Sequence, residues 1–128
     1  MKTINIKKCA LVLLMLVAGS AWADWMIVYE DDKATQYFDP NTVQKKGEKR
    51  QVWQLNDFKK QQKNGVVSIR FKSEYDCSES RMKQLSITAF YGHMASGEVH
   101  TSTNKEGAWS DIPPSTPAAG LLEALCTP

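Results

Sequence analysis

Residues 66–77 alternate apolar and polar side chains, and this alternation constrains the fold more than any other stretch of the sequence. The apolar odd positions are Val67, Ile69, Phe71, Tyr75 and Cys77. The polar even positions are Ser68, Arg70, Lys72, Glu74 and Asp76. Successive side chains of a strand point to opposite faces of a sheet, so the pattern predicts a strand with one buried and one solvated face.

A second alternating run begins at Arg81, after the polar loop at residues 78–80. Its apolar positions are Leu85, Ile87, Ala89 and Tyr91, and they alternate with Gln84, Ser86 and Thr88. Two such runs joined by a short polar loop predict an antiparallel hairpin. Cys77 ends the apolar face of the first run, so we expect another element to be anchored on that face.

The first residues of the chain are similar to a secretory signal peptide. Three lysines precede the apolar run 9–18, and Ala21 and Ala23 place small residues at the two positions that a signal peptidase reads. We therefore expect cleavage between Ala23 and Asp24. An uncleaved anchor is the alternative, but the run is short for a permanent membrane helix. Cys9 opens the run instead of closing it, so no lipid anchor and no stable membrane anchor are expected.

Cleavage would leave residues 24–128 as one small domain. It would remove three of the sixteen basic residues, leaving thirteen against fourteen acidic ones, so the net charge would change from +2 to about −1. This balance does not favour binding to nucleic acid or to a membrane surface. His93 and His100 lie in no motif that supplies a nucleophile or an orienting carboxylate, so neither a catalytic site nor a cofactor is predicted.

Cys77 and Cys126 are the only cysteines of this domain. A single pair in a small exported domain indicates a disulfide, because exported compartments are oxidising. The bridge would close a loop of about 50 residues, for which loop-closure entropy predicts about 4 kcal/mol. A metal site is the alternative, but no histidine lies at ligand spacing from either cysteine.

A short helix is predicted at the C-terminus. Thr116 suits the N-cap and Pro117 the first helical position. The apolar stripe of this helix comprises Ala118, Leu121, Leu122, Leu125 and Cys126. We expect the stripe to lie on the sheet face that carries Val67, Ile69, Phe71 and Tyr75.

Further strands are predicted at residues 25–30, 35–39, 52–58 and 98–103, the last as a polar sheet edge. The predicted fold class is α+β. It consists of an antiparallel meander of five to seven strands with one C-terminal α-helix packed on one face and tied by the disulfide.

Glu74 and Asp76 are the one carboxylate pair that suggests catalysis. They share a strand face at about 7 Å by strand rise, which falls in the range of an inverting glycosidase. Arg70 and Lys72 share that face, however, and favour a solvated ladder of ion pairs. The sequence therefore predicts a protein that is not an enzyme.

Two groups of basic residues and three tryptophans are candidates for binding. The basic residues, which suit an acidic polysaccharide or protein surface, are Lys45, Lys46, Lys49, Arg50, Lys59, Lys60 and Lys63. They flank one predicted strand and belong at its opposite ends, so two small patches are expected. Trp25, Trp53 and Trp109 are expected in the core, although any exposed one would suit a protein interface.

Together these residues resemble the surface-adhesin protein E family of Gram-negative bacteria. The resemblance rests on Tyr37-Phe38-Asp39-Pro40, Val52-Trp53, Tyr75-Asp76-Cys77, Trp109 before Pro113-Pro114, and terminal Cys126. It implies an antiparallel sheet with a disulfide-tied helix, a tendency to form homodimers, and a protein or glycoprotein ligand from host matrix or serum. The namesake is lipid-anchored at the cell surface. This chain lacks that anchor signal, so a periplasmic or secreted location is expected.

Three functional hypotheses follow. The first is an exported, non-enzymatic binding module of the adhesin E type. The second is a periplasmic inhibitor-like or housekeeping binding protein with a partner in the envelope. The third, and the least supported, is a small carbohydrate hydrolase.

Overall fold

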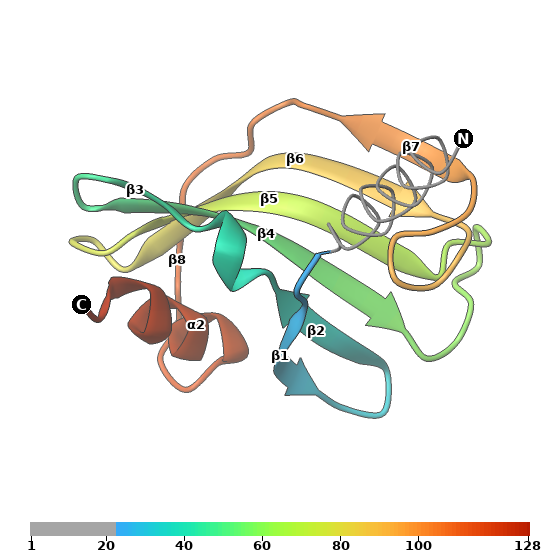
Figure 1. Cartoon of the computed structure of the whole chain (residues 1–128), viewed down its shortest axis with the longest axis horizontal. Coiled ribbons are helices and arrows are strands. Elements are labelled where there is room, and N and C mark those ends of the chain that lie inside the picture. The colour runs from blue at the N-terminus through green and yellow to red at the C-terminus, as the bar shows by residue number, and fades with distance from the viewer. Residues whose placement is uncertain (1–22) are drawn as a thin grey trace, which may run out of the picture.

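The structure is a computed structural model that describes residues 23–128 as one antiparallel sheet and one C-terminal helix (Figure 1). The predicted signal peptide, residues 1–23, lies outside the described residues except for Ala23. The elements in chain order are β1 (Met26–Glu30), β2 (Ala34–Phe38), the 3-10 helix η1 (Pro40–Thr42), β3 (Gln44–Lys46), β4 (Lys49–Phe58), β5 (Ser68–Asp76), β6 (Arg81–Phe90), β7 (Val99–Thr103), β8 (Ser110–Asp111) and α2 (Pro117–Cys126).

Six strands form one continuous antiparallel path in the order β1-β2-β4-β5-β6-β7. This order confirms the predicted meander. Two short strands lie off the path, because β3 pairs with the start of β4 and β8 with the start of β6. The sequence did not predict these two, since strands of three and two residues carry too little pattern to recognise.

A β-bulge interrupts the central β5–β6 hairpin. Lys72 pairs with Ser86 and Ser73 pairs with Gln84, so Leu85 is an extra residue in β6. The extra residue reverses the alternation of β6 on its two sides. Met82, at an even position, consequently packs against the core beneath α2, which simple alternation with Ile87 would not predict.

The helix α2 begins and ends as its sequence predicts. The Thr116 hydroxyl accepts a hydrogen bond from the Ala119 amide at 3.2 Å, and Pro117 occupies the first turn. Leu121 and Leu125 are the buried members of its stripe. Among residues 23–128 no helix has the length and apolarity needed to cross a bilayer.

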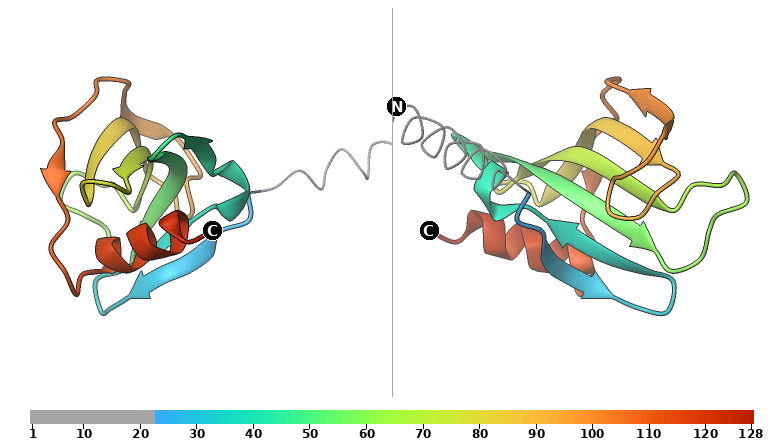
Figure 2. Two further views of the ribbon diagram at one scale, coloured as in Figure 1. Left: turned by 90° about the vertical axis from the view of Figure 1, so that its left-hand side faces the viewer. Right: turned by 45° about the vertical axis from the view of Figure 1, so that its right-hand side comes forward.

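The position of α2 on the sheet differs in part from the prediction. Leu121 and Leu125 pack with Val52, Tyr75 and Ile112, at the end of the sheet where β5 finishes. Figure 2 shows the helix under one end of the curled sheet. The predicted contact with Val67 and Ile69 is wrong, because a ten-residue helix tethered at Cys126 covers only one end of that face.

The predicted disulfide is present between Cys77 and Cys126. The two residues are separated by 49 positions in sequence, and their Cα atoms lie 5.7 Å apart. Cys77 directly follows β5, and Cys126 is the last residue of α2. The Arg50 Nε also donates a hydrogen bond to the Leu125 carbonyl at 3.2 Å. Both links hold the C-terminal end of α2 against the sheet.

Because the Tyr75 side chain is buried, we expect the protein to lose stability in alkali. Burial raises the pKa of Tyr75 from 10.0 to about 12, although a hydrogen bond from its hydroxyl to Gln54 partly opposes the rise. Because the folded-state pKa is raised, the stabilisation is fully present below pH 10 and is lost as the pH rises toward 12. The difference corresponds to about 3 kcal/mol of unfolding free energy. The check is urea unfolding across this range, together with tyrosinate absorbance.

Tyr75→Phe provides the control for this prediction. The variant should lack the ionisation near pH 12 and should lose less stability between pH 10 and 12 than the parent. It should also be weaker at neutral pH, because the buried Gln54 side chain loses its partner. An unchanged alkaline profile in Tyr75→Phe would contradict the assignment.

Candidate binding face

The sheet face opposite α2 combines two tryptophans with five basic side chains. Directly paired residues of antiparallel strands share a face. Trp53 pairs with Lys72, and Val52, which packs under α2, occupies the alternate position. We call this surface the tryptophan–cation face and define it by Lys49, Trp53, Arg70, Lys72, Arg81, Lys83 and Trp109.

Trp109 lies at one end of this face and is surrounded by cations. Its ring centroid is 4.6 Å from the Arg81 guanidinium carbon and 4.7 Å from the Lys83 nitrogen, with Lys49 at 5.8 Å. Each such contact contributes about 0.5–2 kcal/mol. The Gly107 amide donates to the Gln84 carbonyl at 2.8 Å, which holds the β7–β8 connection on the sheet. Trp109 remains half-buried there and is not a core residue.

Trp53 forms a second cation–aromatic centre, four residues along β4 from Lys49 and so about 14 Å away by strand rise. The Arg70 guanidinium carbon lies 5.5 Å from the Trp53 ring and 5.2 Å from the Phe90 ring. The Lys72 nitrogen lies 6.0 Å from Trp53. Among the described residues neither Arg70 nor Lys72 has an ion-pair partner. Their charges are therefore not neutralised within the described part of the protein.

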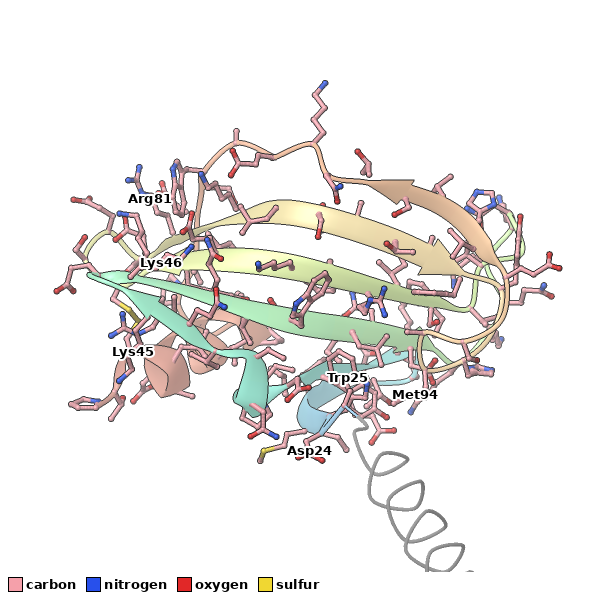
Figure 3. All side chains as sticks on the ribbon, turned by 45° about the horizontal axis from the view of Figure 1, so that its top comes forward. Asp24, Trp25, Lys45, Lys46, Arg81 and Met94 are labelled. Carbon is pink, nitrogen blue, oxygen red and sulfur yellow. A yellow bond between two sulfur atoms is a disulfide. The ribbon has the colours of Figure 1, made fainter. Side chains whose placement is uncertain are left out.

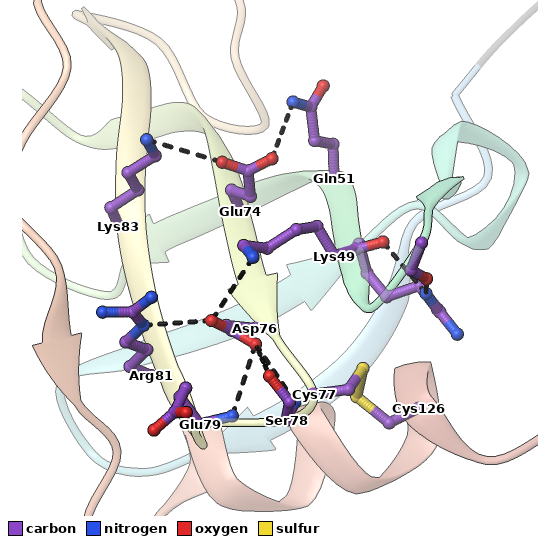
Figure 4. A network of polar contacts seen from close by, with 12 residues as sticks. Lys49, Gln51, Glu74, Asp76, Cys77, Ser78, Glu79, Arg81, Lys83 and Cys126 are labelled. Atoms are coloured by element: carbon purple, nitrogen blue, oxygen red, sulfur yellow. Dashed lines mark hydrogen bonds and ion pairs between the residues drawn. A yellow bond between two sulfur atoms is a disulfide. The ribbon is translucent and has the colours of Figure 1, made fainter.

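Asp76 lies between Lys49 and Arg81, two members of the tryptophan–cation face (Figure 4). Its carboxylate is 1% exposed and accepts hydrogen bonds from the Ser78 hydroxyl at 2.7 Å and the Arg81 Nε at 3.0 Å. It also accepts from the amides of Ser78 and Glu79, and it pairs with Lys49 at 3.5 Å. The Ser78 hydroxyl, followed by Arg81 and the amides, lowers the pKa of Asp76 far below its usual value despite burial. The ionised carboxylate thus fixes the turn that carries Cys77.

The predicted solvated ladder of Glu74 and Asp76 with Arg70 and Lys72 is wrong. Glu74 pairs instead with Lys83 at 3.6 Å, and Asp76 is buried. Residues two apart on one strand are about 7 Å apart, whereas directly opposed residues of neighbouring strands are nearer. The carboxylates therefore form ion pairs with cations on the neighbouring strands. This arrangement also weakens the hydrolase hypothesis, because the Asp76 oxygens are shielded from substrate and occupied by donors.

Because its hydrogen bonds stabilise the ionised form of Asp76, we expect the protein to lose stability in acid. Because the folded-state pKa of Asp76 is lowered, its stabilisation is fully present above the unfolded pKa near 4 and is lost as the pH falls further. Asp76→Asn should lower the urea midpoint at pH 7, and the gap to the parent should narrow below pH 4. Asp32→Asn, in an exposed turn, is the matched control and should leave the midpoint unchanged. A gap that stays constant with pH would contradict this role.

The seven basic residues predicted for binding divide among three places. Lys49 belongs to the Trp109 end of the tryptophan–cation face, and Lys46, which is paired with it, lies near Arg81 in Figure 3. Lys45 and Arg50 are opposite each other in the β3–β4 ladder, and their side chains point toward the face that α2 covers. The remaining three, Lys59, Lys60 and Lys63, follow β4 at its other end, where Lys59 pairs with Glu30 at 3.0 Å.

Sequence reasoning missed four basic members of the face: Arg70, Lys72, Arg81 and Lys83. The alternation placed Arg70 and Lys72 on one side of β5, but the Trp53–Lys72 register was needed to bring them beneath an indole. Trp53 follows Val52 in β4, so the two side chains point to opposite faces of the sheet. That alternation places Trp53 on the face away from the core and was the signal that could have identified this face.

The histidines lie far from this face's Trp109 end. The His93 Nδ1 is 3.1 Å from Asp57, and the His100 Nδ1 is 2.6 Å from the Tyr91 hydroxyl. Within the part of the chain that the structure describes, no three histidine, cysteine or acidic residues are placed to hold a metal ion.

Comparison with known proteins agrees with this architecture. The family model described as surface-adhesin protein E matches residues 25–127. The chain belongs to the surface-adhesin protein E family. No curated protein matches the sequence significantly.

Solved structures of Haemophilus influenzae protein E have a similar fold. Crystal form II of that protein superposes with a TM-score of 0.65 at 12% identity, covering 84% of this chain and 90% of the other. Protein E from non-typeable Haemophilus influenzae superposes with a TM-score of 0.64 at 11% identity, covering 84% and 78%. At this identity the likeness establishes the shared fold. Membership of the surface-adhesin protein E family supports an adhesin-like binding module as the general class of function.

Proposed function

We propose that this adhesin E-family protein is an exported, non-enzymatic binding module that uses the tryptophan–cation face to bind an acidic protein or glycoprotein. The observation that carries the proposal is Trp109. Its half-buried indole is held among Lys49, Arg81 and Lys83 on a sheet face that α2 does not cover.

The chemistry of the face suits recognition of an acidic surface. Tryptophan and arginine are the residues most enriched among interface residues with large energetic effects. Trp109 and Trp53 stand at two centres, each flanked by cations, so an acidic ligand can gain apolar contact and charge pairing together. The processed domain as a whole is near neutrality, which means that its basic character is local to such patches.

Binding of the purified protein to immobilised matrix and serum glycoproteins tests the proposal. Trp109→Ala should weaken binding by more than tenfold, as expected for an indole that anchors an interface. Lys72→Glu should weaken it several-fold, with a smaller effect at high salt. Lys105→Glu makes the same charge change in the exposed β7–β8 connection and should have no effect. Binding that survives both face substitutions would exclude this face.

The exported location rests on family membership and on the N-terminal sequence. The Asp24 amide nitrogen lies 3.3 Å from the Asp39 carboxylate, and Asn41 donates to the Asp24 carboxylate at 2.7 Å. Cleavage after Ala23 would convert that amide to an ammonium group and strengthen the contact with Asp39. N-terminal sequencing of the exported protein should therefore begin at Asp24.

Protease treatment of intact cells then separates the two binding hypotheses. Digestion in intact cells is expected for a surface adhesin. Protection until the outer membrane is opened would instead support the periplasmic binding protein with an envelope partner, and would exclude direct adhesion to a host.

A further inference from the structure

Arg70 has an environment that no described residue completes. Its guanidinium carbon lies 5.5 Å from the centroid of the Trp53 ring and 5.2 Å from that of the Phe90 ring. Its Nε is buried and has no hydrogen-bond partner among the described residues. No described residue forms an ion pair with the Arg70 side chain. A desolvated donor without an acceptor is costly, and because the Nε is closed to solvent, an acceptor from outside the chain would approach the terminal nitrogens of the same guanidinium group.

A small pocket of about 250 Å³ lies at this side chain. It is lined by Ala23, Trp25, Asp39, Thr42, Trp53 and Arg70. Cleavage after Ala23 would remove the first of these, and we call the site formed by the other five the Trp25–Arg70 pocket. Four separate parts of the chain form it: the segment before β1, η1 with its N-cap, β4 and β5. Figure 3 shows Trp25 beside the start of β1, away from Arg81 and Lys46. Sites for drug-sized ligands begin near 300 Å³, so this volume suits a single small ring.

The polar side chains of the pocket suit a ligand that carries both a carboxylate, which accepts hydrogen bonds, and hydroxyl groups, which donate them. Arg70 offers a planar set of donors that matches a carboxylate. Asp39, which is 5% exposed, offers acceptors. The amides of Asn41 and Asp24 use one position on each Asp39 oxygen, and a carboxylate has about four. After cleavage the Asp24 ammonium group would offset part of the Asp39 charge, and the remaining acceptor positions of Asp39 can still accept hydrogen bonds from hydroxyl groups.

The two indoles narrow the choice further. Trp25 and Trp53 both line the pocket, and their indoles give it apolar, aromatic surface. One face of a pyranose ring is made largely of C–H groups and can lie against such a surface, while its hydroxyls point outward. A carboxylate, several hydroxyls and an apolar ring face occur together in a sugar acid.

We propose that the Trp25–Arg70 pocket binds one residue of an acidic glycan. In this arrangement the sugar carboxylate accepts from Arg70, a sugar hydroxyl donates to Asp39, and the ring lies against the indoles. The inference rests on the proposed function and deepens it, because it names the chemical group on the glycoprotein that one part of the tryptophan–cation face recognises.

Titration of the protein with simple glycosides, followed by the indole NMR signals of Trp25 and Trp53, tests this directly. The probes are a methyl glucuronide, a methyl sialoside, a neutral methyl glucoside and acetate. At least one of the two acidic sugars should bind with a millimolar dissociation constant, as expected for a small polar ligand. The neutral glucoside and acetate should bind at least tenfold more weakly. Which acidic sugar binds distinguishes a uronic acid from a sialic acid as the source.

Variants of the pocket test whether Arg70 and Trp25 hold the sugar. Arg70→Lys keeps the charge but loses the planar donors, and should weaken the acidic sugar about tenfold. Arg70→Gln should abolish its binding, and Trp25→Ala should weaken it, while Lys105→Gln should leave it unchanged. A thermal melt of each variant shows whether it folds, and Arg70→Lys preserves the test if Arg70→Gln does not.

The proposal is overturned if the neutral glucoside or acetate binds as tightly as both acidic sugars, if neither acidic sugar binds, or if Arg70→Lys binds them like the parent. Its failure is distinguishable from that of the proposed function. If the acidic sugars fail while glycoprotein binding still depends on Trp109, only the sugar pocket is wrong. If glycoprotein binding survives Trp109→Ala and Lys72→Glu while the sugars bind through Arg70, the sugar pocket stands and the wider binding face is wrong.

Discussion

Loss of the Cys77–Cys126 disulfide is expected to lower the free energy of unfolding by about 4 kcal/mol. The bridge joins residues separated by 49 positions, so its removal frees a long loop in the unfolded chain. It also frees the C-terminal end of α2, a helix of ten residues that would be marginal alone. Small domains have about 5–15 kcal/mol of stability in total, so the effect is a large fraction.

Urea unfolding of the parent and of a Cys77→Ser/Cys126→Ser double variant measures this loss. The double variant is preferable to either single change because it leaves no free thiol. A reducing agent should lower the urea midpoint of the parent and leave that of the double variant unchanged. Amide exchange should show α2 opening first. Coincident midpoints for the two proteins would refute the structural importance of the bridge.

Leu121→Ala is expected to cost about 2–5 kcal/mol, the usual penalty for truncating a buried leucine. Leu121 is 3% exposed and packs with Val52, Tyr75 and Ile112 under the sheet. The cavity lies between a helix and a sheet whose backbone is held by pairing on both sides, so the surroundings can collapse only partly. The urea midpoint measures the loss.

Glu123→Ala is the matched control on the exposed side of α2. It should change the stability by no more than about 0.5 kcal/mol. Combining Leu121→Ala with the double serine variant gives a further test, because both changes loosen α2. If α2 already detaches without the bridge, the cost of Leu121→Ala should shrink in that background. Full additivity would show that α2 stays docked without its disulfide.

Much of the fold could be predicted from short-range patterns. Alternation over residues 66–91 identified the central hairpin, and the order Thr116-Pro117 with leucines at helical spacing identified α2. These signals are local because alternation, capping and helical periodicity arise from backbone geometry within a few residues. The disulfide followed from there being only one pair of cysteines in the predicted domain.

The candidate binding face, in contrast, depends on strand pairing. The register of β4 on β5 places Trp53 beside Lys72, and the approach of the β7–β8 connection places Trp109 beside Arg81 and Lys83. The same pairing buries Asp76, which alternation alone assigned to a solvated face. No local pattern encodes such neighbours, because they are separated by many residues in sequence.

The sequence by itself thus determined which segments become the longer strands and the helix, and which cysteines pair, whereas the short strands β3 and β8 carried too little pattern. The tertiary structure alone decided which side chains share a face. It also decided where the bulge at Leu85 reverses the alternation of β6, and that Trp25 and Arg70 line one pocket. The physical reason is that a side chain's direction is a property of its own strand, whereas its partners depend on the register and curvature of the whole sheet.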